Sequence, residues 1–129
     1  MTAPEADADE DGQLARIESL DRDVPDLPTP GVLFRDITPV LADAEAFTAV
    51  ATELAVQMGD ADVVVGIEAR GFLLGAAAAL IAGTGIVPVR KAGKLPRVSA
   101  SRTYDLEYGT ATLELPADTI EPGTRVFVV

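Results

Sequence analysis

Runs of β-branched residues alternate with alanine- and leucine-rich stretches through the middle of the chain. Residues 62–67 (DVVVGI) are apolar on both faces, which is typical of a buried parallel strand. Residues 72–82 have the composition of a helix that ends at Gly83, and residues 86–89 predict the next strand. Residues 125–129 predict a third buried strand. This order predicts an α/β fold with an open, mostly parallel sheet covered by helices on both faces.

Two further elements flank this unit. Apolar residues recur at helical spacing from Asp43, which can cap a helix, to about Met58, and Gly59 follows as a stop signal. Residues 104–115 alternate between apolar and polar around Gly109, which predicts a hairpin or flap.

The N-terminal region is less regular. Residues 1–12 hold five acidic residues and no basic one, and we expect a disordered acidic tail there. Residues 13–22 are compatible with a short helix. Residues 23–40 are dense in proline, so we expect extended backbone and no regular element. The folded domain is therefore expected over residues 13–129.

Composition excludes several kinds of chemistry. With 129 residues, of which 48% are hydrophobic, the chain suits one globular domain and is not disordered as a whole. It has no cysteine and no histidine, which excludes disulfides, thiol catalysis, zinc sites and histidine-based triads. No apolar run reaches the roughly 18 residues of a membrane span, and the acidic N-terminus is unlike a signal peptide. We expect a cytoplasmic protein that binds no membrane.

Positive charge is concentrated in one segment. The net charge of −11 argues against binding nucleic acid by general electrostatics. Residues 90–102 nevertheless hold half of the basic residues and no acidic one. A solvated basic loop is one interpretation, and an anion-binding site, which the acidic background favours, is the other.

The segment GIEARGF, residues 66–72, follows the first buried strand and opens a helix. Amides at a helix N-terminus, together with Arg70, can cradle a phosphate, and Gly71 lets a ligand approach the backbone. In the alternative interpretation this is an ordinary turn, in which Glu68 and Arg70 pair at the surface.

We expect cations that follow the neighbouring strand to lie at the same edge of the sheet as Arg70. Arg90, Lys91 and Lys94 follow the second strand as Arg70 follows the first, and ligands of such sheets bind beyond the carboxyl ends of the strands. Converging cations suggest a ligand with several negative charges, such as a pyrophosphate. The alternative is that these cations only offset neighbouring acids.

Two other segments could contribute to a site. Glu107 could exchange a proton or stabilise a developing cation, although a lone glutamate in a hairpin is usually only solvated. Residues 32–35 could hold a flat heterocycle with the ring of Phe34 and free amides, unless Phe34 belongs to the core.

Together these segments resemble the adenine phosphoribosyltransferases. The match runs from Asp26 to Val129 through PTPGVLFRDITPVL, DVVVGIEARGFLLGAA, VPVRKAGKLP, YDLEYGTATLEL and EPGTRVFVV. The resemblance implies the type I phosphoribosyltransferase fold and a homodimeric enzyme of purine salvage. Such an enzyme makes AMP and pyrophosphate from adenine and phosphoribosyl pyrophosphate, which carries Mg²⁺.

The resemblance also implies roles for individual residues. Adenine would be recognised by residues 33–35, and the pyrophosphate by residues 68–71 with the cations that follow the second strand. Glu107 would be the catalytic residue that faces the purine imidazole edge, on a flap around residues 95–108 that closes over the site. The substrate-binding residues that it implies are Leu33, Phe34, Arg35, Glu68, Ala69, Arg70, Gly71, Arg90, Lys91, Lys94 and Tyr108.

The family continues beyond the last strand into an acidic pair and a loop rich in glycine and threonine, which binds the ribose and its phosphate. This sequence ends before that loop, so we expect a partial domain with an open sheet edge and little or no transferase activity. The alternatives are a phosphoribosyltransferase for another base, a noncatalytic regulator with the same fold, and a truncated fragment. The segment around Phe34 disfavours another base, and the presence of Glu107 disfavours the regulator.

Overall fold

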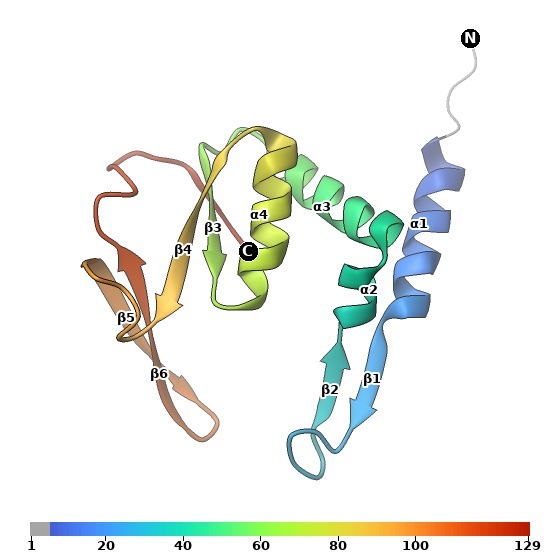
Figure 1. The fold of residues 1–129 in the computed structure, drawn as a ribbon, viewed down its shortest axis with the longest axis horizontal. Helices are drawn as coiled ribbons and strands as arrows, with labels where there is room; N and C mark the ends of the chain where they lie inside the picture. The colour runs from blue at the N-terminus through green and yellow to red at the C-terminus, as the bar shows by residue number, and fades with distance from the viewer. Residues whose placement is uncertain (1–5) are drawn as a thin grey trace. The chain divides into compact units, whose positions relative to one another are not determined.

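The computed structural model of the chain describes residues 6–129, which divide between Val50 and Ala51 into two compact units. Figure 1 shows the mixture of helices and strands that the sequence pattern predicted. In chain order the elements are α1 (Ala6–Leu20), β1 (Arg22–Pro25), β2 (Leu33–Asp36), α2 (Thr38–Ala42), α3 (Ala44–Met58), β3 (Val63–Ile67), α4 (Arg70–Ala82), β4 (Gly85–Lys91), β5 (Val98–Leu106), β6 (Gly109–Pro116) and β7 (Val126–Val128).

The second unit is built on a five-stranded sheet with the order β5-β6-β4-β3-β7. β3 pairs in parallel with both β4 and β7, which confirms the parallel sheet that the βαβ pattern predicted. The hairpin of β5 and β6 joins the same sheet, because β6 pairs antiparallel with the end of β4. The carboxyl ends of β3 and β4 are therefore neighbours, as a shared site requires.

The core of this unit is formed by small side chains between the sheet and α4. Val64 on β3 is fully buried and packs with Met58 and Ala79. Gly75 on α4 allows the close approach, since a side-chain carbon there would lie 3.0 Å from Ile86 and 3.2 Å from Val64. α4 can consequently lie directly against β3 and β4 (Figure 1).

The proline-rich segment of the first unit is more regular than expected. β1 and β2 form an antiparallel ribbon in which Val24 pairs with Phe34, and α2 follows. The expectation of no regular element here was wrong, because the prolines lie where a backbone N–H is dispensable. Pro25 ends β1, and Pro39 lies in the first turn of α2.

Helix α1 begins at Ala6, so residues 6–12, where we expected disorder, are helical in the structure. Alanine and glutamate are good helix formers, so the acidic composition of this segment does not prevent a helix. The remainder of the predicted tail, residues 1–5, lies outside the described residues.

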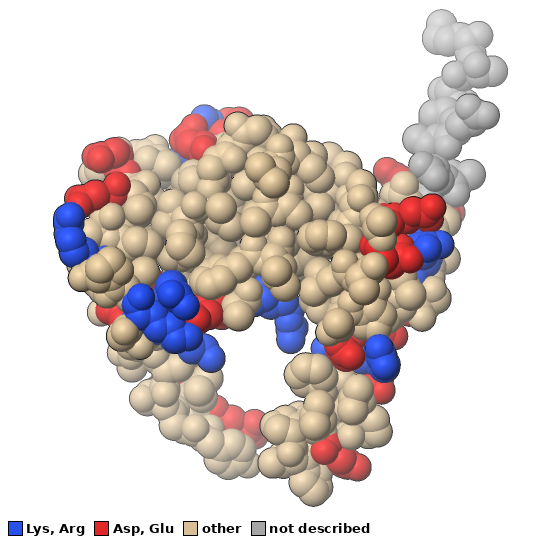
Figure 2. Space-filling model, in the orientation of Figure 1, with Lys and Arg blue, Asp and Glu red and all other residues tan. Residues whose placement is uncertain are grey.

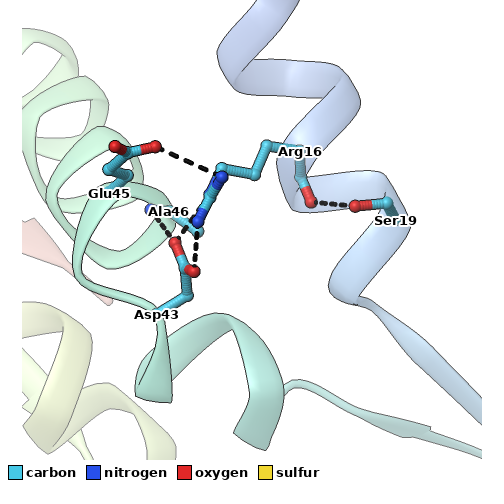
Figure 3. A network of polar contacts seen from close by, with 5 residues as sticks. All are labelled: Arg16, Ser19, Asp43, Glu45 and Ala46. Atoms are coloured by element: carbon cyan, nitrogen blue, oxygen red, sulfur yellow. Dashed lines mark hydrogen bonds and ion pairs between the residues drawn. The ribbon is translucent and has the colours of Figure 1, made fainter.

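A polar network connects α1 to the start of α3 (Figure 3). The guanidinium of Arg16 donates to both carboxylate oxygens of Asp43, at 2.8 and 2.5 Å, and lies 3.3 Å from Glu45. Asp43 also accepts the N–H of Ala46 at 2.9 Å and so caps α3, as the sequence predicted. The bond from Arg16 and the bond from Ala46 lower the pKa of Asp43 to about 2.

The predicted basic loop is shorter than expected. β4 extends through Lys91 and β5 begins at Val98, which leaves residues 92–97 as the connection between them. Among residues 6–129, no helix is long and apolar enough to cross a membrane.

Candidate active site

The turn after β3 is held between the ends of its two neighbouring strands. The N–H of Ile67 donates to the carbonyl of Val129 at 2.8 Å, and the N–H of Glu68 donates to the carbonyl of Val89 at 2.9 Å. α4 then begins without a side-chain cap. The N–H of Phe72 donates to the carbonyl of Ala69 at 3.1 Å, while the N–H groups of Arg70 and Gly71 have no partner within residues 6–129 and can face an anion.

The turn is tight because it contains glycine at positions 66 and 71, where no side chain has room. A side-chain carbon on Gly66 would lie 2.7 Å from the carbonyl oxygen of Gly71, and one on Gly71 would overlap the main chain of Val129. Only hydrogen fits at these positions without a shift of the backbone. Packing within the chain is thus a reason for glycine at position 71, in addition to the approach of a ligand expected from the sequence.

The carboxylate of Glu68 collects donors from the end of β4 and the loop that follows. Its Oε1 accepts Lys94 Nζ at 2.5 Å and Arg90 Nη2 at 3.3 Å, while Oε2 accepts the N–H of Lys91 at 2.7 Å. The Lys94 bond, followed by the Lys91 N–H, lowers the pKa of Glu68 to about 2. Glu68 is therefore ionised throughout the neutral range.

The structure thus brings together the acid of one predicted segment and the cations of the other. The alternative pairing of Glu68 with Arg70 does not form, because Glu68 pairs with Arg90 and Lys94 instead. Arg90 and Lys94 each form an ion pair with this one neighbouring acid. Arg70 is exposed, and within residues 6–129 neither its guanidinium nor the Lys91 ammonium has an ion-pair partner.

Figure 2 shows basic side chains gathered over the connection between β4 and β5, with carboxylates beside them. Arg70 and Lys91, which have no ion-pair partner within residues 6–129, therefore lie at one edge of the sheet with the first two amides of α4. Such an arrangement can bind a polyanion through charge-assisted hydrogen bonds.

Glu107 and Tyr108 form the turn of the β5–β6 hairpin, and both are exposed. Leu113 is the residue of β6 that pairs with Lys91 at the end of β4. Gly109 lies four residues earlier in β6, so the hairpin turn extends roughly 13 Å beyond the end of β4. The structure places Glu107 on a projecting hairpin and not within the cation cluster.

The predicted adenine-recognition segment, residues 33–35, lies on β2 in the first unit. Leu33 and Phe34 are exposed, so Phe34 is not a core residue of that unit. The guanidinium of Arg35 lies 3.3 Å from Asp21 and 3.5 Å from Asp23, which fixes it along the ribbon.

Glu114 was missed by the sequence reasoning. Its carboxylate accepts the N–H of Gly93 at 2.6 Å and so fixes the connection that carries Lys94. The position pairs with Arg90 across β6 and β4. The alternation of residues 110–115 indicates a strand, but only the register between strands shows which loop Glu114 contacts.

Known proteins identify the family. No protein-family model matches the chain. Over 130 residues the chain is 55% identical to an adenine phosphoribosyltransferase of Saccharopolyspora erythraea, a match that covers all of the chain and 71% of that protein. The chain belongs to the adenine phosphoribosyltransferase family. A relative of the same name from Mycobacterium sp. strain KMS is 58% identical over 113 residues, which are 88% of this chain and 65% of the relative.

Solved structures of adenine phosphoribosyltransferases have the same fold. The enzyme of Thermoanaerobacter pseudethanolicus superposes with a TM-score of 0.83 at 46% identity, over 89% of this chain and 68% of that one. The enzyme of Saccharomyces cerevisiae, in complex with adenine and an imino-altritol bisphosphate, superposes with a TM-score of 0.85 at 32% identity. The match covers 92% of this chain and 70% of that one. The type I phosphoribosyltransferase fold expected from the sequence is confirmed.

Proposed function

We propose that this member of the adenine phosphoribosyltransferase family transfers the phosphoribosyl group of phosphoribosyl pyrophosphate to adenine, forming AMP and pyrophosphate. One observation carries the proposal beyond the family name. The ends of β3 and β4 bring Arg70, Lys91, Lys94 and Arg90 to one edge of the sheet, where a pyrophosphate would find several donors.

The chemistry requires such donors. As N9 of adenine bonds to the anomeric carbon, the bond from that carbon to the pyrophosphate oxygen breaks, and the electron pair leaves with the pyrophosphate. Negative charge therefore grows on the leaving group, where Arg70, Lys91 and Lys94 would stabilise it. A well-placed donor of this kind contributes about 10²–10³ in rate.

Glu107 would manage the proton of the purine as N9 becomes a nucleophile, a contribution of about 10²–10⁴ in general acid–base catalysis. Its place on a projecting hairpin suits a flap that closes over the substrates and excludes water. Residues 33–35 would recognise adenine, with Phe34 stacking on the base through its exposed ring.

Mg²⁺ would enter with phosphoribosyl pyrophosphate and not as a resident ion. Within residues 6–129, no group of three or more acidic, histidine or cysteine side chains could hold a metal. The phosphates themselves are ligands that Mg²⁺ prefers, and the cations at the edge of the sheet would bind the remaining charge. By family resemblance we also propose a cytoplasmic homodimer.

The test is calorimetric titration of the chain with magnesium phosphoribosyl pyrophosphate and, separately, with adenine. Hypoxanthine and uracil serve as matched base controls, and AMP formation is followed in parallel. Saturable binding of phosphoribosyl pyrophosphate, and of adenine over the other bases, is the expected result. Binding of neither substrate would overturn the proposal, and binding of hypoxanthine or uracil as tight as that of adenine would favour a phosphoribosyltransferase for another base.

A further inference from the structure

Glu68 is an unfavourable residue for a polyanion to meet directly. A carboxylate within a group of cations reduces their net positive charge and by itself weakens the binding of an anion. Yet the side chain of Glu68 is only 7% exposed, whereas those of Arg90 and Lys94 are 36% and 45% exposed. The carboxylate therefore lies beneath the cations, with its oxygens occupied by their donors.

The bonds to Glu68 leave donor capacity for a ligand. An ammonium has three N–H donors and a guanidinium has five, and Glu68 uses one from Lys94 and one from Arg90. Lys94 lies in the connection between β4 and β5, on a long and flexible side chain. By binding its ammonium before any ligand arrives, Glu68 removes rotamer freedom that the ligand would otherwise have to remove.

Glu68 also fixes the two strand ends against each other. Its main-chain N–H donates to the carbonyl of Val89, and its carboxylate accepts the N–H of Lys91. Glu68 therefore contacts two of the last residues of β4. The placement of the Lys91 side chain consequently depends on Glu68 as well.

We propose that Glu68 is a positioning residue: without touching the pyrophosphate, it holds Lys94 and Arg90 in the arrangement that binds it. This inference rests on the proposed function and deepens it. It gives the two residues of the same turn different roles: Arg70 donates directly to the anion, whereas Glu68 positions other donors.

The experiment titrates inorganic pyrophosphate into the unaltered chain and into Glu68→Gln, Lys94→Gln, the double variant and Glu121→Gln. Glutamine keeps the size of Glu68 and can still accept the Lys91 N–H, but it lacks the charge that holds Lys94. Glu121→Gln is the matched control, because it removes one negative charge from an exposed residue of the same unit.

We expect Glu68→Gln to weaken pyrophosphate binding by about tenfold although it removes a repulsive charge, as loss of a charge-assisted bond would do. Lys94→Gln should weaken binding at least as much. The double variant should bind more weakly than Lys94→Gln, because Arg90 is also released, but by less than the sum of the two separate effects. Glu121→Gln should bind as well as the unaltered chain or better. Tighter binding by Glu68→Gln, or additive effects of the two substitutions, would overturn the proposal.

A direct readout of Lys94 accompanies the titration. Lys91 and Lys94 are the only lysines in the sequence, so the nitrogen spectrum of the ammonium groups contains just two side-chain signals. The Lys94 signal should exchange slowly with water in the unaltered chain and in Glu121→Gln, and rapidly in Glu68→Gln. An unchanged signal in Glu68→Gln would overturn the inference.

The outcomes separate this inference from the proposed function. If the unaltered chain binds no pyrophosphate, the proposed function fails and this inference fails with it. If the unaltered chain binds but Glu68→Gln binds equally well, only this inference fails. Should Glu68→Gln not fold, Glu68→Asp replaces it, with a partial loss of binding and of the slow Lys94 signal expected, and full retention of both contradicting the proposal.

Discussion

Gly71 lies directly against the main chain of Val129. Any side-chain carbon on Gly71 would overlap the Val129 carbonyl, the same group that accepts the N–H of Ile67. The start of α4, the end of β3 and the end of β7 thus meet at one point. The position of the turn that carries Glu68 and Arg70 depends on this contact.

Gly71→Ala should therefore destabilise the chain. The added methyl group meets backbone on both sides and has no flexible side chain to displace, so we expect a loss of about 1–3 kcal/mol in the free energy of unfolding. Urea unfolding followed by circular dichroism measures it. Gly85→Ala is the control, since a carbon there has open space and no positive φ, and an equal loss in both variants would contradict the argument.

The network of Arg16 and Asp43 predicts a pH dependence of stability. The pKa of Asp43 is lowered from 3.8 to about 2 in the folded chain, first of all by the bond from Arg16. A group with a lowered pKa stabilises the fold above its unfolded value and loses that effect as the pH falls through its folded value. Asp43 therefore contributes fully above about pH 4, and this contribution should be lost between 3.8 and about 2.

Thermal unfolding at stepped pH values checks this expectation. Asp43→Asn should be less stable than the unaltered chain at neutral pH and should lose less stability between pH 4 and pH 2. Arg16→Gln removes the main cause of the lowered pKa and should flatten the same part of the profile. Identical slopes in the unaltered chain and both variants would show that Asp43 is not the group responsible.

The local elements of the second unit could be predicted because their signals are local. The β-branched run of β3 and the glycine at position 83, where φ is 75° and α4 ends, are both visible in the sequence. The partners of Glu68 could not be predicted, because they depend on how the end of β4 and a six-residue connection fold back onto the turn. The β1–β2 ribbon was missed for a similar reason, since Arg22 pairs with the distant Asp36 and the prolines concealed the strands.

The hairpin turn offers a test of flap closure. The chain has no cysteine, so Tyr108→Cys provides a single site for a fluorescent label on a residue that is 90% exposed. We expect the label to become shielded from a soluble quencher when phosphoribosyl pyrophosphate and adenine are both present. A label at Leu80→Cys, on the exposed surface of α4, is the control and should not respond. Equal responses of the two labels would argue against closure of the hairpin.

Arg70 should contribute to anion binding as a direct donor, in contrast to Glu68. Its exposed guanidinium has no ion-pair partner within residues 6–129, so Arg70→Gln breaks no ion pair of the described chain and should leave thermal stability nearly unchanged. Pyrophosphate affinity should fall by about 10-fold to 100-fold, as expected when one charge-assisted pair is lost.

The salt dependence provides the second measurement for Arg70. Because one screened charge contact is removed, the affinity of Arg70→Gln should vary less steeply with salt than that of the unaltered chain. Arg125→Gln, just before the start of β7 and at the opposite end of the parallel strands, is the matched control for the loss of one positive charge and should retain most of the affinity. If Arg125→Gln weakened binding as much as Arg70→Gln, the anion would be attracted by the net charge of this unit and not bound at the start of α4.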